Sequence, residues 1–456
     1  MDADFDLITI GAGSAGVAAS RRAAALGAKV AIVEAGRIGG TCVLRGCVPK
    51  KLLMYAAGLH DAFAEAPGYG WTLEPPRFEM ARWAQAKAAE TARLEAVYRR
   101  MLEGAGVEIV AGRAQLEDPN TVRIGERRLR ARHVVVATGA SPARDTIPGI
   151  DACATSDELL DLQALPRRAA IVGGGYIAVE FASHLARLGV AVELFYRDRL
   201  PLRGFDEMLR TGAAAALAAA GVTLHPGNAP REVQRTGDGF LLVAADERTR
   251  DFEWVLNATG RRPNTEGLPL ERDDRGALRV DARLQTSWPG VYAVGDVTDR
   301  RNLTPVAIAE GRAVAELLFG GSGATLPDLE HVASAVFMLP PLATVGPSEA
   351  EALAAGLTVE VYETEFRPMR QAFVGGEERT RMKLLVDTAD QRVLALHMLG
   401  ADAPEIVQSL AVALTAGARK QDFDRTMAVH PTAAEEFVLM RAPSRVVGPE
   451  TQTGRA

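Results

Sequence analysis

The sequence predicts a multidomain α/β protein, and three observations support that fold class. The chain has 456 residues, which is too long for one hydrophobic core and typical of about three or four domains. Hydrophobic residues make up 48% and charged residues 24% of the chain, as in ordinary globular proteins. A short apolar strand followed by a glycine-rich turn and a helix occurs twice, from Phe5 and again from Ala169.

The charge and hydropathy of the chain exclude several functional classes. Its formal net charge of −6 provides no basic surface for nucleic acid. No apolar run reaches the roughly 20 residues that span a bilayer, and the acidic start, Asp2–Asp6, is unlike a secretory or transit peptide. We therefore expect a cytoplasmic protein. Thiols are kept reduced in that compartment, so a disulfide there is expected to be catalytic.

The first glycine-rich stretch has the pattern of a dinucleotide-binding unit. Strand Phe5–Ile10 leads into the turn Gly11–Gly16, a helix follows, and the strand Lys29–Val33 ends at Glu34. Glycines allow the tight turn and let the helix N-terminus approach a pyrophosphate, while the carboxylate can accept hydrogen bonds from a ribose. This pattern predicts a Rossmann-like unit whose cofactor contacts are Gly11, Gly13, Ser14, Ala15, Gly16 and Glu34.

The second stretch repeats this pattern with a different residue at the ribose position. Its strand Val192–Phe195 ends in Tyr196-Arg197-Asp198-Arg199 rather than in a carboxylate. Arginines can pair with a 2′-phosphate that an acid would repel, so the sequence favours NADP(H) over NAD(H). Solvated surface charge is the alternative, mainly for Arg199. The predicted contacts of this second cofactor are Gly173, Gly174, Gly175, Tyr176, Ile177, Glu180, Arg197, Arg203, Gly260 and Arg261.

Two strands that end in Thr-Gly, at Gly139 and Gly260, divide the chain into domains. We expect the first dinucleotide unit at 1–139, the second at 140–263, and a return to the first at 264–330. A Gly/Ser-rich loop precedes residues 331–441, which contain no third glycine fingerprint. This last part is expected to be an α+β domain for assembly or substrate capture. The Pro/Gly/polar tail at 442–456 is expected to be disordered.

Two of the three cysteines, Cys42 and Cys47, lie close together within the stretch Gly39–Lys51. A loop of this length can close a disulfide, and a tight pair beside a cofactor fold indicates a reversible dithiol. A structural disulfide or half of a zinc site is the alternative, although no second Cys or Cys/His pair has zinc-ligand spacing. Cys153 is expected to be a packed apolar residue.

Two carboxylate-bearing segments add candidate functional residues. His430 precedes Glu435 by five positions, and a carboxylate can fix the imidazole tautomer for acid/base work. Asp296 follows strand Val291–Val294 and can approach the ribityl or phosphate region of a cofactor, with a simple turn aspartate as the alternative.

Together these stretches resemble the FAD-dependent pyridine nucleotide–disulfide oxidoreductases over roughly residues 4–441. The resemblance is closest to members that reduce glutathione disulfide with NADPH. It is carried by the motifs at 39–51, 175–180, 202–206, 303–309 and 430–436.

The resemblance implies a role for each matching residue. FAD would contact Ser14, Glu34, Thr41, Cys42, Lys50, Thr138, Asp296, Thr304 and His430. Lys50, or its neighbour Lys51, would pair with Glu180 near the flavin, and Tyr176 would gate the nicotinamide pocket. Cys47 would lie nearest the flavin and Cys42 would attack the substrate. His430, paired with Glu435, would come from the partner subunit of a homodimer and protonate the leaving thiolate.

The resemblance also implies a substrate pocket, formed by Ser14, Arg21, Tyr98, Arg312, Met369 and Arg370. Arginines suit the carboxylates of glutathione. Arg370 stands where many such reductases have tyrosine, which leaves another low-molecular-weight anionic disulfide open. A lipoamide dehydrogenase-like flavoenzyme is a further alternative, disfavoured because Tyr196-Arg197 replaces the acid that selects NAD. A redox-sensing flavoprotein would not need the pair of His430 and Glu435.

Overall fold

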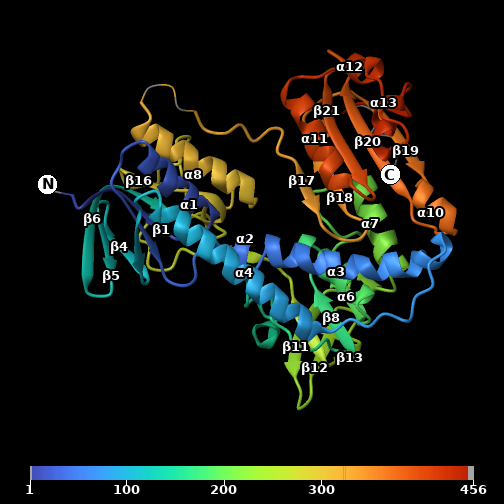
Figure 1. The fold of residues 1–456 in the computed structure, drawn as a ribbon, viewed down its shortest axis with the longest axis horizontal. Coiled ribbons are helices and arrows are strands. Elements are labelled where there is room, and N and C mark those ends of the chain that lie inside the picture. Colours follow the sequence, from blue (N-terminus) through green and yellow to red (C-terminus); the bar gives the residue numbers. More distant parts are fainter. Residues whose placement is uncertain (1–2, 322, 324, 450–456) are drawn as a thin grey trace.

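The computed structural model describes residues 3–321, 323 and 325–449. Figure 1 shows the first dinucleotide unit at the left, around β1, β6, α1 and α8. The second unit, around β8 and α6, lies below, and the C-terminal domain, with β19–β21 and α11, lies at the upper right. Helix α3 (Cys47–Glu65) runs between the second unit and the C-terminal domain. The predicted α/β fold class, with two dinucleotide units and a C-terminal α+β domain, is confirmed.

The first unit is built on a parallel sheet in the order β3-β2-β1-β6, with β16 also paired to β6. Strand β1 has a nearly continuous apolar sequence because both faces of a parallel sheet are covered. The antiparallel strands β4 and β5 extend the sheet beyond β6. The strands are β1 (Phe5–Ile10), β2 (Val30–Glu34), β3 (Glu108–Ala111), β4 (Ala114–Asp118), β5 (Thr121–Ile124), β6 (Arg127–Val136) and β16 (Val291–Ala293).

Residues 264–330 return to this unit through β16 and α8 (Thr304–Phe319), which packs along α1 (Ser14–Ala25). The helices approach closely at Gly311, where an added Cβ would stand 2.4 Å from the Ala15 carbonyl oxygen. The remaining helices of this part are α2 (Gly40–Leu44), η1 (Ala66–Tyr69), α4 (Met80–Glu103) and η3 (Gly295–Thr298).

The second unit repeats the parallel sheet in the order β10-β9-β8-β14, and β11–β13 form a separate antiparallel sheet. The chain enters through β7 and leaves through β15, which pair with each other. The elements are β7 (Ala140–Pro142), η2 (Ile150–Ala152), α5 (Ser156–Leu159), β8 (Arg168–Val172), α6 (Tyr176–Arg187), β9 (Ala191–Tyr196), α7 (Glu207–Ala219), β10 (Thr223–Pro226), β11 (Pro230–Arg235), β12 (Phe240–Ala244), β13 (Thr249–Phe252), β14 (Trp254–Asn257) and β15 (Arg261–Pro263).

The C-terminal domain contains an antiparallel sheet in the order β17-β18-β21-β20-β19-β22. Its elements are β17 (Ser334–Val336), β18 (Leu342–Val345), α9 (Glu349–Ala354), β19 (Val359–Phe366), α10 (Met369–Val374), β20 (Thr380–Asp387), β21 (Val393–Leu399), α11 (Ala403–Thr415), α12 (Lys420–Arg425), η4 (Ala433–Glu435), α13 (Glu436–Leu439) and β22 (Arg445–Val447). The expectation of a disordered tail at 442–456 is wrong for β22, because it pairs with β19 and Arg445 forms ion pairs with Glu349 and Glu363. Residues 450–456 lie outside the described residues.

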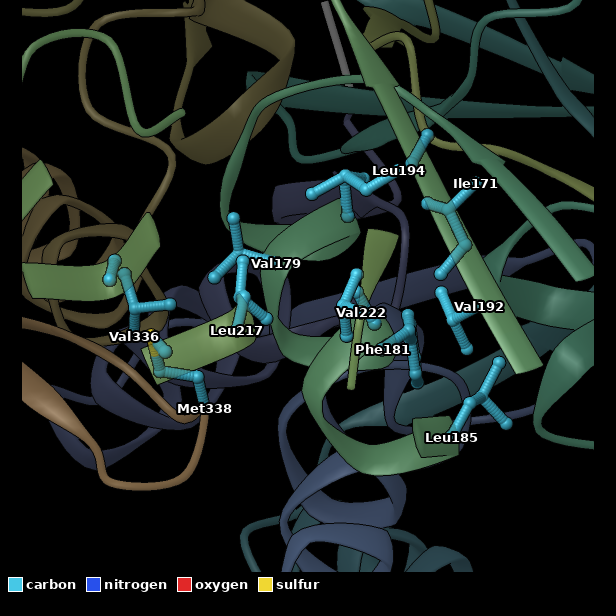
Figure 2. Packing of buried hydrophobic residues seen from close by; sticks show 14 of the residues in the cluster. Ile171, Val179, Phe181, Leu185, Val192, Leu194, Leu217, Val222, Val336 and Met338 are labelled. Atoms are coloured by element: carbon cyan, nitrogen blue, oxygen red, sulfur yellow. The ribbon is translucent and has the colours of Figure 1, made fainter. Parts of the chain in front are cut away.

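The second unit and the C-terminal domain share one hydrophobic core. Figure 2 shows Val179, Phe181 and Leu185 of α6 in the same cluster as Val336 and Met338, which belong to the C-terminal domain. Burial of apolar surface at this boundary holds the two domains together. Within the described residues, no helix combines the length and apolar character needed to cross a membrane.

Candidate active site

A cavity of about 730 Å³ lies where the two dinucleotide units and the C-terminal domain meet. That volume is typical of a small-molecule or cofactor site. It collects most of the predicted redox residues, since its lining includes Gly13, Ser14, Thr41, Cys42, Cys47, Lys50, Tyr176, Ile177, Glu180, Arg261, Asp296 and Thr304.

Cys42 and Cys47 interact directly at this cavity. Cys42 lies in the short helix α2, and Cys47 is the first residue of α3. A hydrogen bond from Cys42, aided by Thr304 and Lys50, lowers the pKa of Cys47 to about 6. The same hydrogen bond, together with burial, raises the pKa of Cys42. Cys47 is therefore the thiolate near neutral pH, and Cys42 keeps its proton.

Lys50 joins the first unit to the second. Its Nζ lies 2.5 Å from Glu180 Oε1, and Glu180, on α6, is only 1% exposed. The same carboxylate oxygen accepts the N–H of Phe337 at 2.8 Å. Lys51 lies over the Phe337 ring, as Lys50 does, but its Nζ is 3.9 Å from Glu405. The partner of Glu180 is therefore Lys50 and not Lys51.

Tyr176 stands at the mouth of the cavity. It is the first residue of α6, and Lys50 Nζ lies 5.5 Å from the centre of its ring. The side chain is 43% exposed although it lines the cavity. The ring therefore borders both the cavity and the solvent.

The first glycine turn brings the backbone close to a strand and leaves the N-terminus of α1 without a side-chain cap. Gly11 has φ +104°, and an added Cβ would stand 2.4 Å from the Ala137 carbonyl oxygen. The N-cap of α1, Gly13, has no side chain to cover the helix N-terminus. The buried Ser14 hydroxyl faces the Cys42 thiol and has no nitrogen or oxygen partner among the described residues. A buried hydroxyl normally has a partner, so these residues fit a phosphate-bearing cofactor.

Glu34 ends β2 and Thr138 follows β6, the two strands on either side of β1. Glu34 Oε2 accepts the Ala12 N–H at 2.7 Å, and its Oε1 accepts the Gly36 N–H at 2.8 Å. Thr138 Oγ1 donates to the Asn264 carbonyl at 2.7 Å. Both therefore lie at the carboxyl edge of the first sheet, where nucleotides bind in such folds.

Asp296 is positioned by a residue to which the sequence assigned no role. Burial raises the pKa of Asp296. The preceding Gly295 donates its N–H to Glu310 Oε2 at 2.8 Å, and Arg300 binds the other oxygen of Glu310 at 3.0 Å. Glu310 is 1% exposed. A lone glutamate on the otherwise apolar face of the helix that begins at Thr304 was the signal that could have identified it.

The second glycine turn repeats the first, and the arginines follow the next strand. Gly173 has φ +137°, and an added Cβ would stand 2.2 Å from the Ala258 carbonyl oxygen. Arg197 is exposed, and Arg203 Nε lies 2.8 Å from Asp198. Arg199 pairs with Glu207 instead. Arg261, which follows Gly260, lies at the redox cavity, with Nη2 3.5 Å from Thr41 Oγ1.

Comparison with known proteins agrees with this geometry. Residues 5–311 match the pyridine nucleotide-disulphide oxidoreductase family, and residues 332–441 match the dimerisation domain of that family. The chain belongs to the pyridine nucleotide-disulphide oxidoreductases. The family predicted from the sequence is thereby confirmed, and membership implies FAD and NADPH as cofactors.

Three relatives of this oxidoreductase are each named glutathione reductase. The protein of Burkholderia cepacia is 48% identical over 444 residues, covering 96% of this chain and 98% of the relative. That of Nostoc sp. is 43% identical over 460 residues, covering 97% and 100%. The chloroplastic/mitochondrial protein of Pisum sativum is 43% identical over 461 residues, covering 97% and 83%.

Other predicted residues of this oxidoreductase lie away from the cavity. His430 Nδ1 is 2.9 Å from Glu435 Oε2, but His430 is 81% exposed on the C-terminal domain. Met369 is exposed on α10, and Arg370 pairs with Glu65 at 2.6 Å. Because Glu65 is the last residue of α3, this pair lies about 27 Å along the helix from Cys47.

The remaining substrate candidates lie on the first unit. Tyr98 is close enough to Cys42 and Cys47 for both to help raise its pKa, after burial as the main cause. Arg21 is half-buried, and its Nε makes no hydrogen bond to a described residue. Arg312 is exposed on α8. Within one chain, therefore, Ser14 and Tyr98 lie near the two cysteines. His430, Met369 and Arg370 lie away from them.

Proposed function

We propose that this protein is an NADPH-dependent glutathione-disulfide reductase that acts as a homodimer. The observation that carries the proposal is the interacting pair of Cys42 and Cys47, with separated pKa values, at a cavity lined by both dinucleotide units and the C-terminal domain. The names of the relatives support the choice of glutathione disulfide. Reduction of another low-molecular-weight anionic disulfide is the alternative, favoured only by the presence of Arg370.

Residues of both units would hold the cofactors. Gly11, Gly13, Ser14 and Glu34 suit FAD, and Arg197 and Arg203 suit the 2′-phosphate of NADPH. When bound, FAD supplies a relay for an electron pair from nicotinamide to a disulfide. Lys50 keeps a positive charge beside the cysteines and favours the Cys47 thiolate, while Glu180 keeps that charge in place.

The reduced cysteine pair can then reduce the substrate by thiol exchange. Cys42 Sγ gives its proton to a base and attacks one substrate sulfur, which forms a mixed disulfide and releases the other half as a thiolate. That thiolate takes the proton from the base. Cys47 then attacks Cys42 Sγ, which closes the Cys42–Cys47 disulfide and releases the second substrate thiolate, to be protonated from solvent.

The base in this scheme is His430 of the partner subunit. Because the pKa of Cys42 is raised, its proton needs an acceptor. Glu435 faces His430 Nδ1 and favours the tautomer that leaves Nε2 free to take up a proton. Within one chain His430 is exposed and absent from the lining of the redox cavity. A second copy can supply it, which makes the active site shared.

Exposed apolar side chains on α3 and α10 support the proposal that the partner subunit covers this surface in the homodimer. Tyr55, Leu59 and Phe63 recur every four residues along α3 and are exposed, as are Met369 and Phe373 of α10. An apolar stripe of this kind is typical of a helix that packs against a partner. We also place the protein in the cytoplasm, because an NADPH-driven disulfide reductase suits a compartment whose thiols are kept reduced.

The test is NADPH oxidation by the FAD-loaded protein with glutathione disulfide, lipoamide and trypanothione disulfide measured in parallel. We expect fast turnover with glutathione disulfide alone. Activity confined to another disulfide would support the thiol-exchange chemistry but reject glutathione disulfide as the substrate. No activity with any disulfide would reject the proposed function.

A further inference from the structure

We propose that Lys383, in the C-terminal domain, is a positioning residue for recognition of the 2′-phosphate of NADPH by the second unit. It would act through Asp206, which ends the segment that carries Arg203. Because Arg203 is assigned to the 2′-phosphate under the proposed function, this inference rests on that function and extends it to a residue outside the cofactor-binding units.

The segment 198–206 is fixed at its start by the glycine turn and by α7. The Leu202 N–H donates to the Gly174 carbonyl at 2.7 Å, and Leu202 is 1% exposed. Arg210 of α7 donates to the carbonyls of Leu200 and Pro201, both at 2.9 Å. The exposed Arg203 side chain extends from this backbone and pairs with Asp198 of the same segment at 2.8 Å, so it moves with the segment, whose backbone α7 holds through Arg210.

Asp206 holds α7 against the C-terminal domain. As the N-cap of α7 it accepts the Met208 N–H at 2.9 Å, and it is only 2% exposed. Its Oδ1 also accepts from Lys383 Nζ at 2.8 Å, and its Oδ2 accepts the Glu349 N–H at 3.1 Å. Two of these three bonds come from the other domain. Asp206 therefore fixes the start of α7 to the neighbouring domain.

Lys383 is the cation that neutralises Asp206. Lys383 lies on β20, is 2% exposed, and also contacts Glu349 at 2.9 Å and Glu363 at 3.2 Å. Those two carboxylates have a second cation, because Arg445 contacts each of them at 2.5 Å. His397 Nε2 lies 3.9 Å from Asp206, but burial lowers the pKa of His397 to about 4, so the ring is neutral near pH 7. Neutralisation of Asp206 thus depends on Lys383.

Removing the Lys383 charge should affect one part of the cofactor site selectively. An unpaired buried carboxylate would draw water or move toward solvent, and α7 would shift with it. Arg203 would move away from the 2′-phosphate position. The turn Gly173–Gly175 also packs against Ala258 and Tyr196 and contacts the segment only at Pro201 and Leu202, so the pyrophosphate position should remain.

The test compares Lys383→Met with a matched control, Lys420→Met, in the FAD-loaded protein. Lys420 is 3% exposed, lies in the same domain and pairs with Asp424 of the same helix. Binding of adenosine 2′,5′-bisphosphate and of adenosine 5′-diphosphate is measured by calorimetry. For Lys383→Met we expect about tenfold weaker binding of the bisphosphate and less than about twofold for the diphosphate. For Lys420→Met neither should change.

Two further variants keep the assignment open to refutation. If Lys383→Met does not fold, the double variant Asp206→Asn with Lys383→Met removes both charges and keeps a good helix cap. It should show the same selective loss. Equal weakening of both probes, or none, would overturn the positioning role. Arg203→Ala should weaken the bisphosphate alone, and an unchanged affinity there would overturn the NADPH assignment itself.

Discussion

The two dinucleotide units have the same sheet topology and glycine turn, and they differ in the residue that would face the ribose of the nucleotide. Their parallel sheets run in corresponding orders, β3-β2-β1-β6 and β10-β9-β8-β14, and each first glycine has a positive φ beside a strand carbonyl. The second strand ends in Glu34 in the first unit and leads into Arg197 in the second. The sheet and the glycine turn therefore fix where a pyrophosphate lies, and the residues at the end of the second strand select the cofactor.

The units also differ in how their first helices are held. Helix α1 packs against α8, which belongs to the same unit. Helix α6 packs against α3 and against Val336 and Met338 of the C-terminal domain. The first unit is thus completed by its own chain segment, whereas the second is stabilised by its neighbours. This difference explains how residues outside the second unit can affect its function.

The largest expected effect comes from removing the nucleophilic thiol of Cys42, which only the first unit carries. Cys42→Ser should lower disulfide reduction about 10³-fold or more, because Ser lacks a comparable nucleophile. Bound FAD, followed by its absorbance, should remain. Cys153→Ser is the matched control and should keep full turnover, because Cys153 is buried away from the cavity. Substantial reduction by Cys42→Ser would contradict the mechanism.

Lys50→Met should break the ion pair that joins the two units. Glu180 would remain buried without its cation, so we expect the free energy of unfolding to fall by about 3 kcal/mol. Urea unfolding of the FAD-loaded protein measures this. Lys51→Met should change it by less than about 1 kcal/mol, since the only carboxylate near Lys51 among the described residues is the exposed Glu405 at 3.9 Å, and a methionine can keep the packing on the Phe337 ring. Equal losses in both variants would refute the choice of Lys50.

Arg197→Glu should make the ribose position of the second unit resemble that of the first. A carboxylate there would repel a 2′-phosphate and accept hydrogen bonds from a ribose. The ratio of kcat/KM for NADPH to that for NADH should fall about 100-fold. Arg199→Glu is the control and should change the ratio far less, because the Arg199 side chain is bound to Glu207 at the start of α7, whereas Arg197 forms no ion pair within the described residues. An unchanged ratio in Arg197→Glu would reject its contact with the 2′-phosphate.

The smallest expected effect is on the titration of Cys47. In the reduced protein its thiolate absorbance should appear with a midpoint near pH 6. A hydrogen bond to the thiolate favours the charged form, so its loss in Cys42→Ala should raise the pKa toward the ordinary value. A midpoint that does not rise would show that Cys42 is not the main cause of the low pKa.

Much of the fold and part of the site could be predicted from the sequence. Strand β1 matches its predicted range because a run of apolar residues is buried on both faces. The choice between Lys50 and Lys51 could not be made, because adjacent helical residues point in different directions and only the packing of α3 on α6 decides. β22 was missed because so short a strand exists only through its pairing with β19.

The most direct test of the central claim is anaerobic addition of one equivalent of NADPH to the oxidised, FAD-loaded protein. Newly formed thiols are then alkylated and assigned by mass spectrometry. The account predicts two new thiols per chain, at Cys42 and Cys47, with NADH far slower than NADPH. No new thiols at these positions, or equal rates with the two nucleotides, would contradict it.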